Sequence, residues 1–454
     1  MFKSILIANR GEIALRIVRA CKEMGIRSVA VHSEADFESL HVQYADADIC
    51  IGPARSSESY LHIPSIISAA EIADVEAIHP GYGFLSEDAH FAEICRSCNI
   101  AFIGPSVEAI KLAGNKVEAR KVMKKAGIPV VPGSANTVST SDEALAVAHE
   151  IGFPVVIKAA LGGGGRGMRV AHNDVSLVSA FLTAQTEADA AFGDKSLYVE
   201  KYIDTVRHIE FQVMADRFRN IVHLGERECT IQRRYQKLIE ESPSPALDPK
   251  LRKVMGEAAI EAARAVSYDS VGTIEFLLNE DRDFYFIELN SRIQVEHPVT
   301  ESVTGIDIVK EQIRLAAGER LGISQRDVKI NGWAIECRVF AEDPDNDFRP
   351  CPGRITKFNV PGGPGIRVDT HVYEGYRVPE YYDSMLVKVI AWGQNRREAL
   401  RRARRAMEET VIEGVPTTVP LNLKVLQHNK FQRGEISTNF VPELMLMEKS
   451  SGRA

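Results

Sequence analysis

The sequence predicts a multidomain chain of α/β and α+β architecture, and three observations along its 454 residues support this. A strand, a helix and a second strand follow one another at the N-terminus, which is typical of a parallel α/β sheet. A β-hairpin of alternating apolar and polar residues lies near residue 280, within a region of mixed strands and helices. Beyond residue 330, strands separated by Gly- and Pro-rich turns predominate. A chain of this length is expected to fold as about two to four domains.

The amino-acid composition and net charge limit the classes of protein to which this chain can belong. A formal net charge of −7, with 45% hydrophobic and 26% charged residues, is typical of a globular protein and argues against a general nucleic-acid surface. The Arg-rich run RREALRRARRAMEE carries Glu at i, i+4 spacing, which favours a solvated helix face. The N-terminal apolar run is too short for a signal peptide, and no run approaches the ~20 residues of a membrane span. We therefore expect a cytoplasmic protein with neither a membrane nor a nucleic-acid partner.

The seven cysteines are scattered and odd in number, which argues against a disulfide framework and for a reducing compartment. Cys95 and Cys98 form one C-x-x-C, which could be redox-active or half of a zinc site. No second pair accompanies them and their segment has a helical pattern, so packed thiols are the favoured interpretation.

The N-terminal residues predict a βαβ unit: SILIAN as a buried strand, RGEIALRIVRACKEMG as an amphipathic helix, and RSVAVHS as the next strand. The first turn, NRGEI, lacks the G-x-G-x-x-G of a dinucleotide site. A later loop, HPGYGFLSE, follows the carboxyl end of a predicted strand, where open α/β sheets bind ligands. Gly81 and Gly83 bracket Tyr82 and would let it project, with a plain tight turn as the alternative.

A glycine-rich segment, FPVVIKAALGGGGRGMRV, predicts a strand ending at Lys158, a flexible loop and a second strand. No G-K-[ST] opens a helix, so this is not a Walker motif. Backbone N–H groups of such a loop can close over phosphates, with Lys158 as a point charge. A surface hairpin would not need five glycines in the six residues from Gly162 to Gly167, so phosphate binding is favoured.

The segment from Thr273 to His297, TIEFLLNEDRDFYFIELNSRIQVEH, carries the most informative pattern. A turn centred on Asp281 and Arg282 places Glu275 opposite Glu288 on one face. Like charges facing each other are destabilising, unless a divalent cation lies between them. If the second strand stays extended, one parity carries Glu288, Asn290, Arg292, Gln294 and Glu296, while Leu289, Ile293 and Val295 point into a core. A solvated strand face is the alternative.

Other candidates are less specific. Glu200, Lys201 and Ile203 end a predicted strand, LYVEKYID, that could run along an adenine. Lys116 and His208 could equally be an exposed lysine and a structural histidine. Gln232, Arg233, Arg234 and Lys237 lie close together in sequence and would suit an anionic substrate. Arg338 lies between Glu336 and Glu342, so a structural ion pair is its alternative.

Taken together, these segments resemble the biotin carboxylase family. HPGYGFLSE, KAALGGGGRGM, EKYI, QRRYQK and IELNSRIQVEHPVTE match it in order over nearly the whole chain. The resemblance implies an ATP-grasp fold with a mobile glycine-rich lid, and RIQVEHPVTE separates this family from other ATP-grasp ligases. The family usually has His where this chain has Tyr235, a departure that could alter contacts near the nucleotide but removes no charge that the chemistry needs.

The resemblance also implies a role for each matching residue. ATP would be bound by Lys116, Lys158, Gly164, Gly165, Glu200, Lys201, Ile203, His208, Gln232, Tyr235, Glu275 and Glu288. Mg²⁺ or Mn²⁺, expected as two ions, would be held by Glu275, Glu288 and Asn290. Bicarbonate would be positioned by Lys237, Arg292, Gln294, Val295 and Arg338. Glu296 would be the general base, and Tyr82 and Arg338 would bind biotin; the catalytic set is Arg292, Glu296, Lys237 and Arg338.

The family implies three domains: residues 1–114, an ATP-grasp domain over 115–330 with a lid at about 130–203, and residues 331–446. It further implies a homodimer that carboxylates biotin on a separate carrier protein and works with carboxyltransferase subunits, since no A-M-K-M sequence is present. Acetyl-CoA carboxylase is the expected complex, with pyruvate or propionyl-CoA carboxylase as alternatives. Another carboxylate–amine ligase and a non-catalytic nucleotide-binding regulator are the remaining alternatives.

Overall fold

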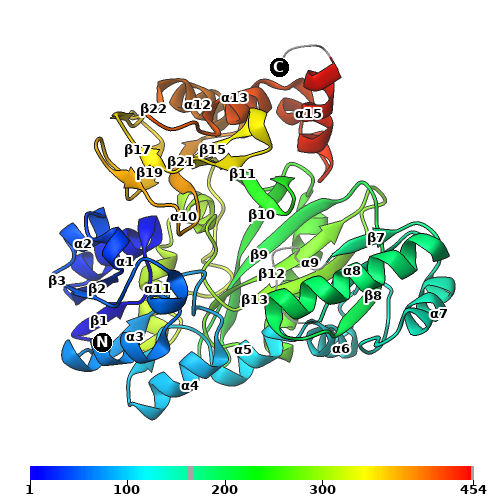
Figure 1. Ribbon diagram of the computed structural model, residues 1–454, viewed down its shortest axis with the longest axis horizontal. Coiled ribbons are helices and arrows are strands. Elements are labelled where there is room, and N and C mark those ends of the chain that lie inside the picture. The colour runs from blue at the N-terminus through cyan, green and yellow to red at the C-terminus, as the bar shows by residue number, and fades with distance from the viewer. Residues whose placement is uncertain (161–167, 451–454) are drawn as a thin grey trace.

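The computed structural model describes residues 1–160 and 168–450, and its chain forms three regions around one long antiparallel sheet (Figure 1). The predicted multidomain α/β and α+β class is confirmed: a parallel sheet comes first and a strand-rich region comes last. No helix within these described residues is both long enough and apolar enough to cross a membrane.

The N-terminal region is a five-stranded parallel sheet in the order β3-β2-β1-β4-β5. Its strands are β1 (Ser4–Ile7), β2 (Arg27–His32), β3 (Ala47–Cys50), β4 (Ala77–His79) and β5 (Ala101–Phe102). Its helices are α1 (Gly11–Glu23), α2 (Leu40–Tyr44), α3 (Ile63–Ile72), α4 (Ala89–Ser97) and α5 (Val107–Gly114). All four residues of β1 are buried, as a parallel strand covered on both faces requires. The loop with Tyr82 follows β4, at the sheet's carboxyl edge.

The central sheet has eight strands in the order β13-β12-β9-β10-β11-β14-β21-β19, and every neighbouring pair is antiparallel. Its strands are β9 (Arg207–Ala215), β10 (Ile221–Arg233), β11 (Gln236–Ser242), β12 (Val271–Leu278), β13 (Phe284–Asn290), β14 (Trp333–Phe340), β19 (Ile366–Thr370) and β21 (Met385–Gly393). Helices α6 (Lys116–Lys125), α9 (Pro249–Ala265), α10 (His297–Thr304) and α11 (Ile308–Ala316) pack around it. Because β11 pairs with β14, the sheet continues into the strand-rich C-terminal region.

The hairpin of β12 and β13 confirms the predicted pairing of Glu275 with Glu288. The turn and the register differ in detail, because Phe276 pairs with Phe286 and a bulge at Ile287 shifts the ladder by one residue before Glu275. The strand also ends at Asn290, so the expectation of an extended chain as far as Glu296 is wrong. Glu296 is instead the N-cap residue of α10, and Val295 is partly exposed, whereas Leu289 and Ile293 are buried as expected.

A small antiparallel sheet, β7-β6-β8, carries the predicted α+β unit beside the hairpin (Figure 1). It consists of β6 (Val155–Ala159), β7 (Arg169–Ala171), β8 (Leu197–Lys201), α7 (Ser141–Ile151) and α8 (Asp174–Phe192). Lys158 lies near the end of β6 as predicted, and a second strand follows the glycine segment. The predicted loop glycines, Gly162–Gly165 and Gly167, lie outside the described residues.

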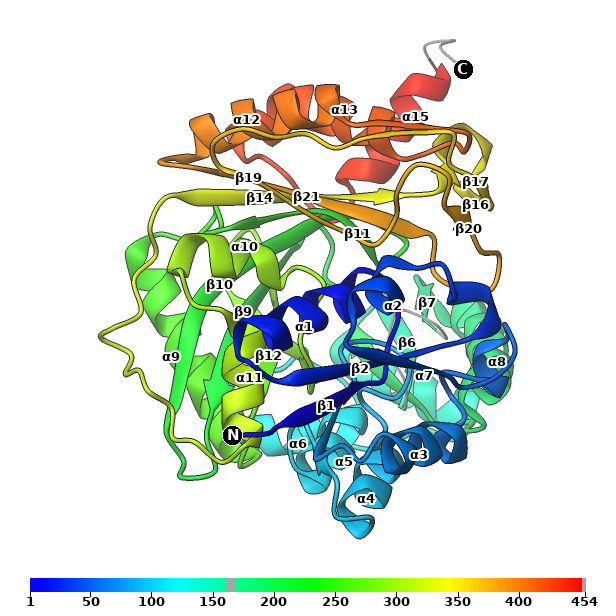
Figure 2. The ribbon, with the colours of Figure 1, turned by 90° about the vertical axis from the view of Figure 1, so that its left-hand side faces the viewer.

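The C-terminal helices cover the far end of the central sheet, with α12 and α13 above β14, β19 and β21 (Figure 2). The helices are α12 (Arg396–Glu409), α13 (Val419–Gln427), α14 (Asn429–Arg433) and α15 (Phe440–Ser450). The short strands are β15 (Glu342–Asp343), β16 (Arg349–Pro350), β17 (Gly353–Arg354), β18 (Lys357–Asn359), β20 (Arg377–Val378) and β22 (Val411–Glu413). The sequence predicts one strand in GRITKFNV and two final helices, near 396–410 and 419–428. The segment instead forms two short strands, β17 and β18, and two further helices, α14 and α15, follow α13.

Candidate active site

One large cavity, of about 960 Å³, lies where the N-terminal region, the small sheet and the central sheet meet. It is lined by every predicted site residue that the structure describes, namely Tyr82, Lys116, Lys158, Glu200, Lys201, Ile203, His208, Gln232, Tyr235, Lys237, Glu275, Glu288, Asn290, Arg292, Gln294, Val295, Glu296 and Arg338. Gly164 and Gly165 lie outside the described residues. Residues up to 256 positions apart, from Tyr82 to Arg338, thus converge on a single pocket.

A row of carboxylates crosses three adjacent strands, and two of its members, Glu275 and Glu288, line the cavity. Glu275 on β12 pairs with Glu288 on β13 and, on its other side, with Glu210 on β9. Arg227 on β10 comes next in the row, directly opposite Glu210, and donates a hydrogen bond to it. Sequence reasoning missed Glu210 and Arg227, because nothing local to β9 or β10 reveals which strand lies beside β12.

Lys237 compensates much of this negative charge. Its Nζ lies 2.6 Å from Glu210, 3.3 Å from Glu275 and 2.5 Å from Glu296. Burial alone would raise the pKa of Glu275, but Lys237 and His208 hold that pKa far below its ordinary value. For Glu210 burial prevails over Arg227, and its pKa is raised. Burial opposes the charge on Lys237, but Cys229 and the three neighbouring carboxylates outweigh it and raise the pKa of Lys237, so the ammonium stays charged.

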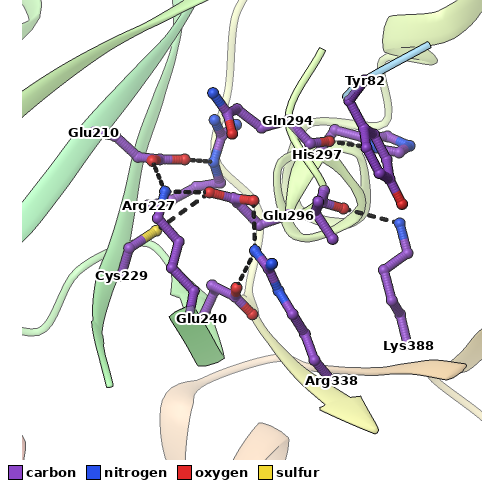
Figure 3. A network of polar contacts seen from close by, with 12 residues as sticks. Tyr82, Glu210, Arg227, Cys229, Glu240, Gln294, Glu296, His297, Arg338 and Lys388 are labelled. Carbon is purple, nitrogen blue, oxygen red and sulfur yellow. Dashed lines mark hydrogen bonds and ion pairs between the residues drawn. The ribbon is translucent and has the colours of Figure 1, made fainter. Parts of the chain in front are cut away.

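Glu296 lies between two cations and is fully buried (Figure 3). Besides Lys237, it accepts a hydrogen bond from Arg338 Nη2 at 2.7 Å. These two cations, against the opposing effect of burial, hold its pKa well below the ordinary value, so it is a carboxylate at neutral pH. Arg338 Nη2 also lies 2.5 Å from Glu240, so its ion-pair partners are Glu240 and Glu296 and not Glu336 or Glu342, which the sequence suggested. The structure therefore presents an ionised, buried carboxylate beside a guanidinium.

The opposite end of the cavity contains simpler ion pairs. Lys116 Nζ lies 2.7 Å from Glu288, and Lys158 Nζ lies 2.6 Å from Glu200. Lys201 donates through Nζ to the carbonyls of Gly152 and Phe153, so its side chain also anchors the small sheet. Lysines that lie beside Glu side chains in an accessible pocket can shift toward phosphate oxygens when these arrive.

His208 and Asn290 both contact Glu275. His208 Nε2 lies 2.8 Å from one oxygen of Glu275, and Asn290 Nδ2 donates to the other at 2.9 Å. Burial opposes protonation of His208, but Glu275 outweighs it and the pKa of the imidazole is raised. Glu275, Glu288 and Asn290 present oxygens on neighbouring strands, which are the ligands that hard divalent cations prefer. These residues therefore fit the expected Mg²⁺ or Mn²⁺.

Arg292 is held in place from two sides. Its Nε lies 2.9 Å from Glu87, and its Nη1 donates to Gln294 Oε1 at 3.2 Å. Sequence reasoning missed the role of Glu87, although this residue is the last one of the HPGYGFLSE segment in the loop after β4. Arg292 lines the same cavity as Gln294, and its planar guanidinium suits a small planar anion.

Not all of the predicted cationic cluster faces the cavity. Arg233 and Arg234 both pair with Asp347, at 2.5 and 3.3 Å. Arg234 lines the cavity but Arg233 does not, so the prediction of an anion-binding site made of all four cluster residues is wrong. Gln232 and Lys237 are cross-strand partners and turn inward. Arg234 and Tyr235 form the tight turn between β10 and β11, with φ of 47° and 68°. Tyr235 is 52% exposed at the cavity rim.

Comparisons with known proteins agree with this geometry. Three family models match consecutive parts of the chain: "Biotin carboxylase, N-terminal domain" over residues 1–110, "Carbamoyl-phosphate synthase L chain, ATP binding domain" over 115–324, and "Biotin carboxylase C-terminal domain" over 336–443. Biotin carboxylase of Nostoc sp. is 57% identical, with 98% of this chain and 99% of the relative covered. The chain belongs to the biotin carboxylase family.

Other relatives define the range of this family. A pyruvate carboxylase subunit from Methanothermobacter thermautotrophicus is 53% identical, with 98% of this chain and 90% of the relative covered. A biotin carboxylase complex with β,γ-ATP from Campylobacter jejuni superposes with a TM-score of 0.96 at 52% identity, covering 98% of this chain and 99% of that one. The biotin carboxylase domain dimer of Hydrogenobacter thermophilus 2-oxoglutarate carboxylase, with MgADP, ADP and bicarbonate, gives 0.95 at 48% identity, covering 98% of each chain.

Membership of the family makes this chain an ATP-grasp ligase, and the resemblance inferred from its motifs is confirmed. Cys95 and Cys98 are both free thiols. Cys95 is buried, as expected for a packed thiol, whereas Cys98 is exposed and does not meet that expectation. Cys229 is also buried, and its Sγ lies 3.8 Å from Glu296.

Proposed function

We propose that this chain carboxylates biotin on a separate carrier protein, with ATP and bicarbonate, as the first half-reaction of an acetyl-CoA carboxylase. The observation that carries the proposal is Glu296, buried between Lys237 and Arg338 in the same cavity as the hairpin carboxylates. A base, a cation and a nucleotide-side cluster within one pocket are what coupling of ATP cleavage to carboxylation requires.

The nucleotide is assigned to the end of the cavity formed by Lys116, Lys158, Glu200 and the end of β8. Lys116 and Lys158 would contact phosphates, and the chain from Glu200 to Ile203 would follow the adenine. His208, Gln232 and Tyr235 complete the proposed ATP-binding set, with Gly164 and Gly165 closing over the phosphates. The relatives crystallised with β,γ-ATP and with MgADP support this assignment.

Glu275, Glu288 and Asn290 are proposed to hold Mg²⁺ or Mn²⁺ at the phosphates. The bound ion would neutralise charge that develops on the transferred phosphoryl group. Glu288 would exchange Lys116 for the ion, which leaves the Lys116 ammonium free to contact phosphate. Glu275 keeps His208 and Lys237 as partners, so its ionised form is maintained.

Bicarbonate is assigned to Arg292, Gln294, Val295, Lys237 and Arg338. Arg292 would bind the anion through its planar fork, and Glu296 would accept the proton as a bicarbonate oxygen attacks the γ-phosphorus. The bond from that phosphorus to the β,γ-bridging oxygen would break, so that ADP leaves and carboxyphosphate forms. Arg338 would then stabilise negative charge on the ureido oxygen of biotin, with Tyr82 lining that side. Carboxyphosphate is labile in water, so closure of the cavity is part of the proposal.

The partners follow from this reaction. We infer a biotin carrier protein, carboxyltransferase subunits and a homodimer, the last supported by the dimer of the Hydrogenobacter relative. Domain limits at 1–114, 115–330 and 331–446, and a cytoplasmic location, remain predictions.

A second candidate is the same half-reaction within a pyruvate carboxylase, because a relative that is named as part of a pyruvate carboxylase is 53% identical. Labelled bicarbonate, ATP and free biotin test the shared chemistry, and we expect labelled carboxybiotin. Absence of label with a folded protein would contradict the function. Purification with its native partners and assay with acetyl-CoA, propionyl-CoA and pyruvate distinguishes the complexes; transfer only to pyruvate would overturn the acetyl-CoA assignment.

A further inference from the structure

Lys388 is a buried lysine in the middle of an otherwise apolar strand. Its side chain is 0% exposed, and its neighbours on β21, Val387 and Val389, are equally buried. Lysine is almost never fully buried unless it is paired. The cross-strand neighbour of Lys388 on β14 is Arg338, another cation, so the ladder itself provides one unfavourable contact. Its other cross-strand neighbour, on β19, is Asp369.

Two partners from other segments take up the ammonium of Lys388. Nζ lies 2.9 Å from Glu12 Oε1 and donates a hydrogen bond to the backbone carbonyl of Val295 at 2.8 Å. Burial opposes the charge on Lys388, but Glu12 and other carboxylates outweigh it and its pKa is raised. A charged lysine therefore fixes the peptide group that joins Val295 to Glu296.

Glu12 extends this contact to a third segment. It lies in the first turn of α1, is 3% exposed, and accepts a hydrogen bond from the hydroxyl of Tyr82 on the same oxygen that faces Lys388. In Figure 3, Lys388 and Tyr82 approach Glu296 from the side opposite to Glu210 and Cys229. One carboxylate and one ammonium thus connect the N-terminal region, the C-terminal strand β21 and the segment before α10.

We propose that Lys388 and Glu12 are positioning residues for the carboxylation step, which together fix the Val295–Glu296 peptide and the Tyr82 hydroxyl. The proposal rests on the proposed function, in which Val295 positions bicarbonate, Glu296 is the base and Tyr82 lines the biotin side. Neither Lys388 nor Glu12 touches the nucleotide end, where Lys116 and Lys158 lie. Small displacements of reacting groups cost rate steeply, to about 10²-fold for 1 Å, so an effect confined to bicarbonate and biotin is expected.

The chain offers a matched control for a merely structural role. Arg396 and Glu241 also form an inter-element ion pair, at 2.7 Å, with side chains only 14% and 2% exposed, and neither residue lines the cavity. Loss of such a pair lowers stability without displacing a substrate-binding group. Arg396→Met should therefore lower the melting temperature and leave the KM values for ATP, bicarbonate and biotin unchanged.

The test compares Lys388→Met with that control in the full-length protein. For Lys388→Met we expect kcat for biotin carboxylation to fall and the KM for bicarbonate to rise by about tenfold, while the KM for ATP stays within about twofold. An unchanged kcat and bicarbonate KM would overturn the proposal. So would a parallel rise in the KM for ATP, which indicates general loss of structure.

Two milder variants decide the matter if Lys388→Met fails to fold. Tyr82→Phe removes only the hydroxyl, and Glu12→Gln keeps a hydrogen-bonding side chain of the same size. Both should raise the KM for biotin by about three- to tenfold with the KM for ATP unchanged. If both leave the KM values for biotin and bicarbonate unaltered, the proposal is wrong. A parent protein that forms no carboxybiotin would instead contradict the proposed function, which separates the two failures.

Discussion

The charged side chains at the two ends of the cavity differ in the number of their partners and in their burial. At the nucleotide end, each lysine has one nearby Glu partner, and Lys116 and Glu288 keep side chains that are 16% and 22% exposed. At the carboxylation end, Lys237 contacts three carboxylates, and its partners Glu210 and Glu296 are 0% and 1% exposed. We call the first set the exchangeable pairs (Lys116–Glu288 and Lys158–Glu200) and the second the Lys237 network (Lys237, Glu210, Glu275, Glu296 and Arg338).

The difference in burial suits the two sets of residues to different functions. Lys116, Lys158 and Glu288 keep some contact with water, so these groups can change partners at a lower cost than fully buried ones. Glu200 is buried, but it also pairs with Arg120 at 3.1 Å and so keeps a cation when Lys158 moves. In the Lys237 network, removal of one charge leaves others buried without compensation, which is strongly destabilising. The exchangeable pairs are therefore suited to binding and release, and the Lys237 network to holding Glu296 and Arg338 in a fixed arrangement.

The largest effect is expected from Lys237→Met, because it leaves three carboxylates without their shared cation. We expect the free energy of unfolding to fall by about 3–5 kcal/mol and biotin carboxylation to be lost. Chemical denaturation measures the first quantity. Lys121→Met is the control, since Lys121 pairs with Glu118 at the surface, where a loss below about 1 kcal/mol is expected. Similar losses in both variants would contradict the contrast between the two ends.

Glu288→Gln should affect activity more than stability, because Glu288 belongs to an exchangeable pair. We expect turnover to fall by about 10²-fold or more, with weaker metal-dependent nucleotide binding, since one anionic ligand oxygen is lost. Steady-state kinetics and calorimetry with Mg-ATP measure both. Glu280→Gln, at the hairpin turn, should do little; equal effects at the two positions would contradict the paired-carboxylate site.

Sequence reasoning named the residues of the exchangeable pairs, though not their pairing, and every member of the Lys237 network except Glu210, and the reason is topological. Glu275 and Glu288 lie on one hairpin, so their pairing follows from a local turn. Glu210 lies on β9, and no feature of its own segment reveals that β9 pairs with β12. The family resemblance identified Lys237, Glu296 and Arg338, but it gave no information about which carboxylates surround them.

The same limit applies to Lys388 and Glu12. A lone lysine within SMLVKVIAWG was a local indication of a buried, paired charge, but its partner is 376 residues earlier in the chain. The exact register of β12 and β13 was also not predicted, because no glycine or proline marks the bulge at Ile287. Long-range strand order and backbone irregularity are thus what the sequence does not reveal.

Glu240, which pairs with Arg338 of the Lys237 network, makes the stability of the protein depend on pH. Burial raises the pKa of Glu240 to about 7 from its ordinary 4.5, although Arg338 opposes the shift. The folded protein then holds this proton more tightly than the unfolded chain does, so stability falls as pH rises from about 4.5 to 7. Glu240→Gln should reduce this fall by about 1–3 kcal/mol, measured by denaturation across that range. Glu413→Gln, at an exposed position, should leave the pH dependence of stability unchanged. Identical pH profiles for the parent and Glu240→Gln would exclude a raised pKa of Glu240.

The smallest effect is expected from Tyr235→His, which introduces the residue that the family resemblance leads us to expect at this position. Tyr235 is 52% exposed at the cavity rim and makes no ion pair that holds the network together. The KM for ATP should change by less than about threefold, because only rim contacts differ. A change of kcat beyond about tenfold would place Tyr235 within the catalytic machinery.

The central claim is that Glu296 acts in carboxylation and not in nucleotide binding, and Glu296→Ala tests it most directly. Calorimetry with Mg-ATP and carboxybiotin formation from labelled bicarbonate should be measured on the same preparation. We predict a nucleotide affinity close to that of the parent, with carboxylation slower by about 10²- to 10⁴-fold, as loss of a general base requires. Carboxylation within about tenfold of the parent, or an equal loss of ATP affinity, would contradict the assignment.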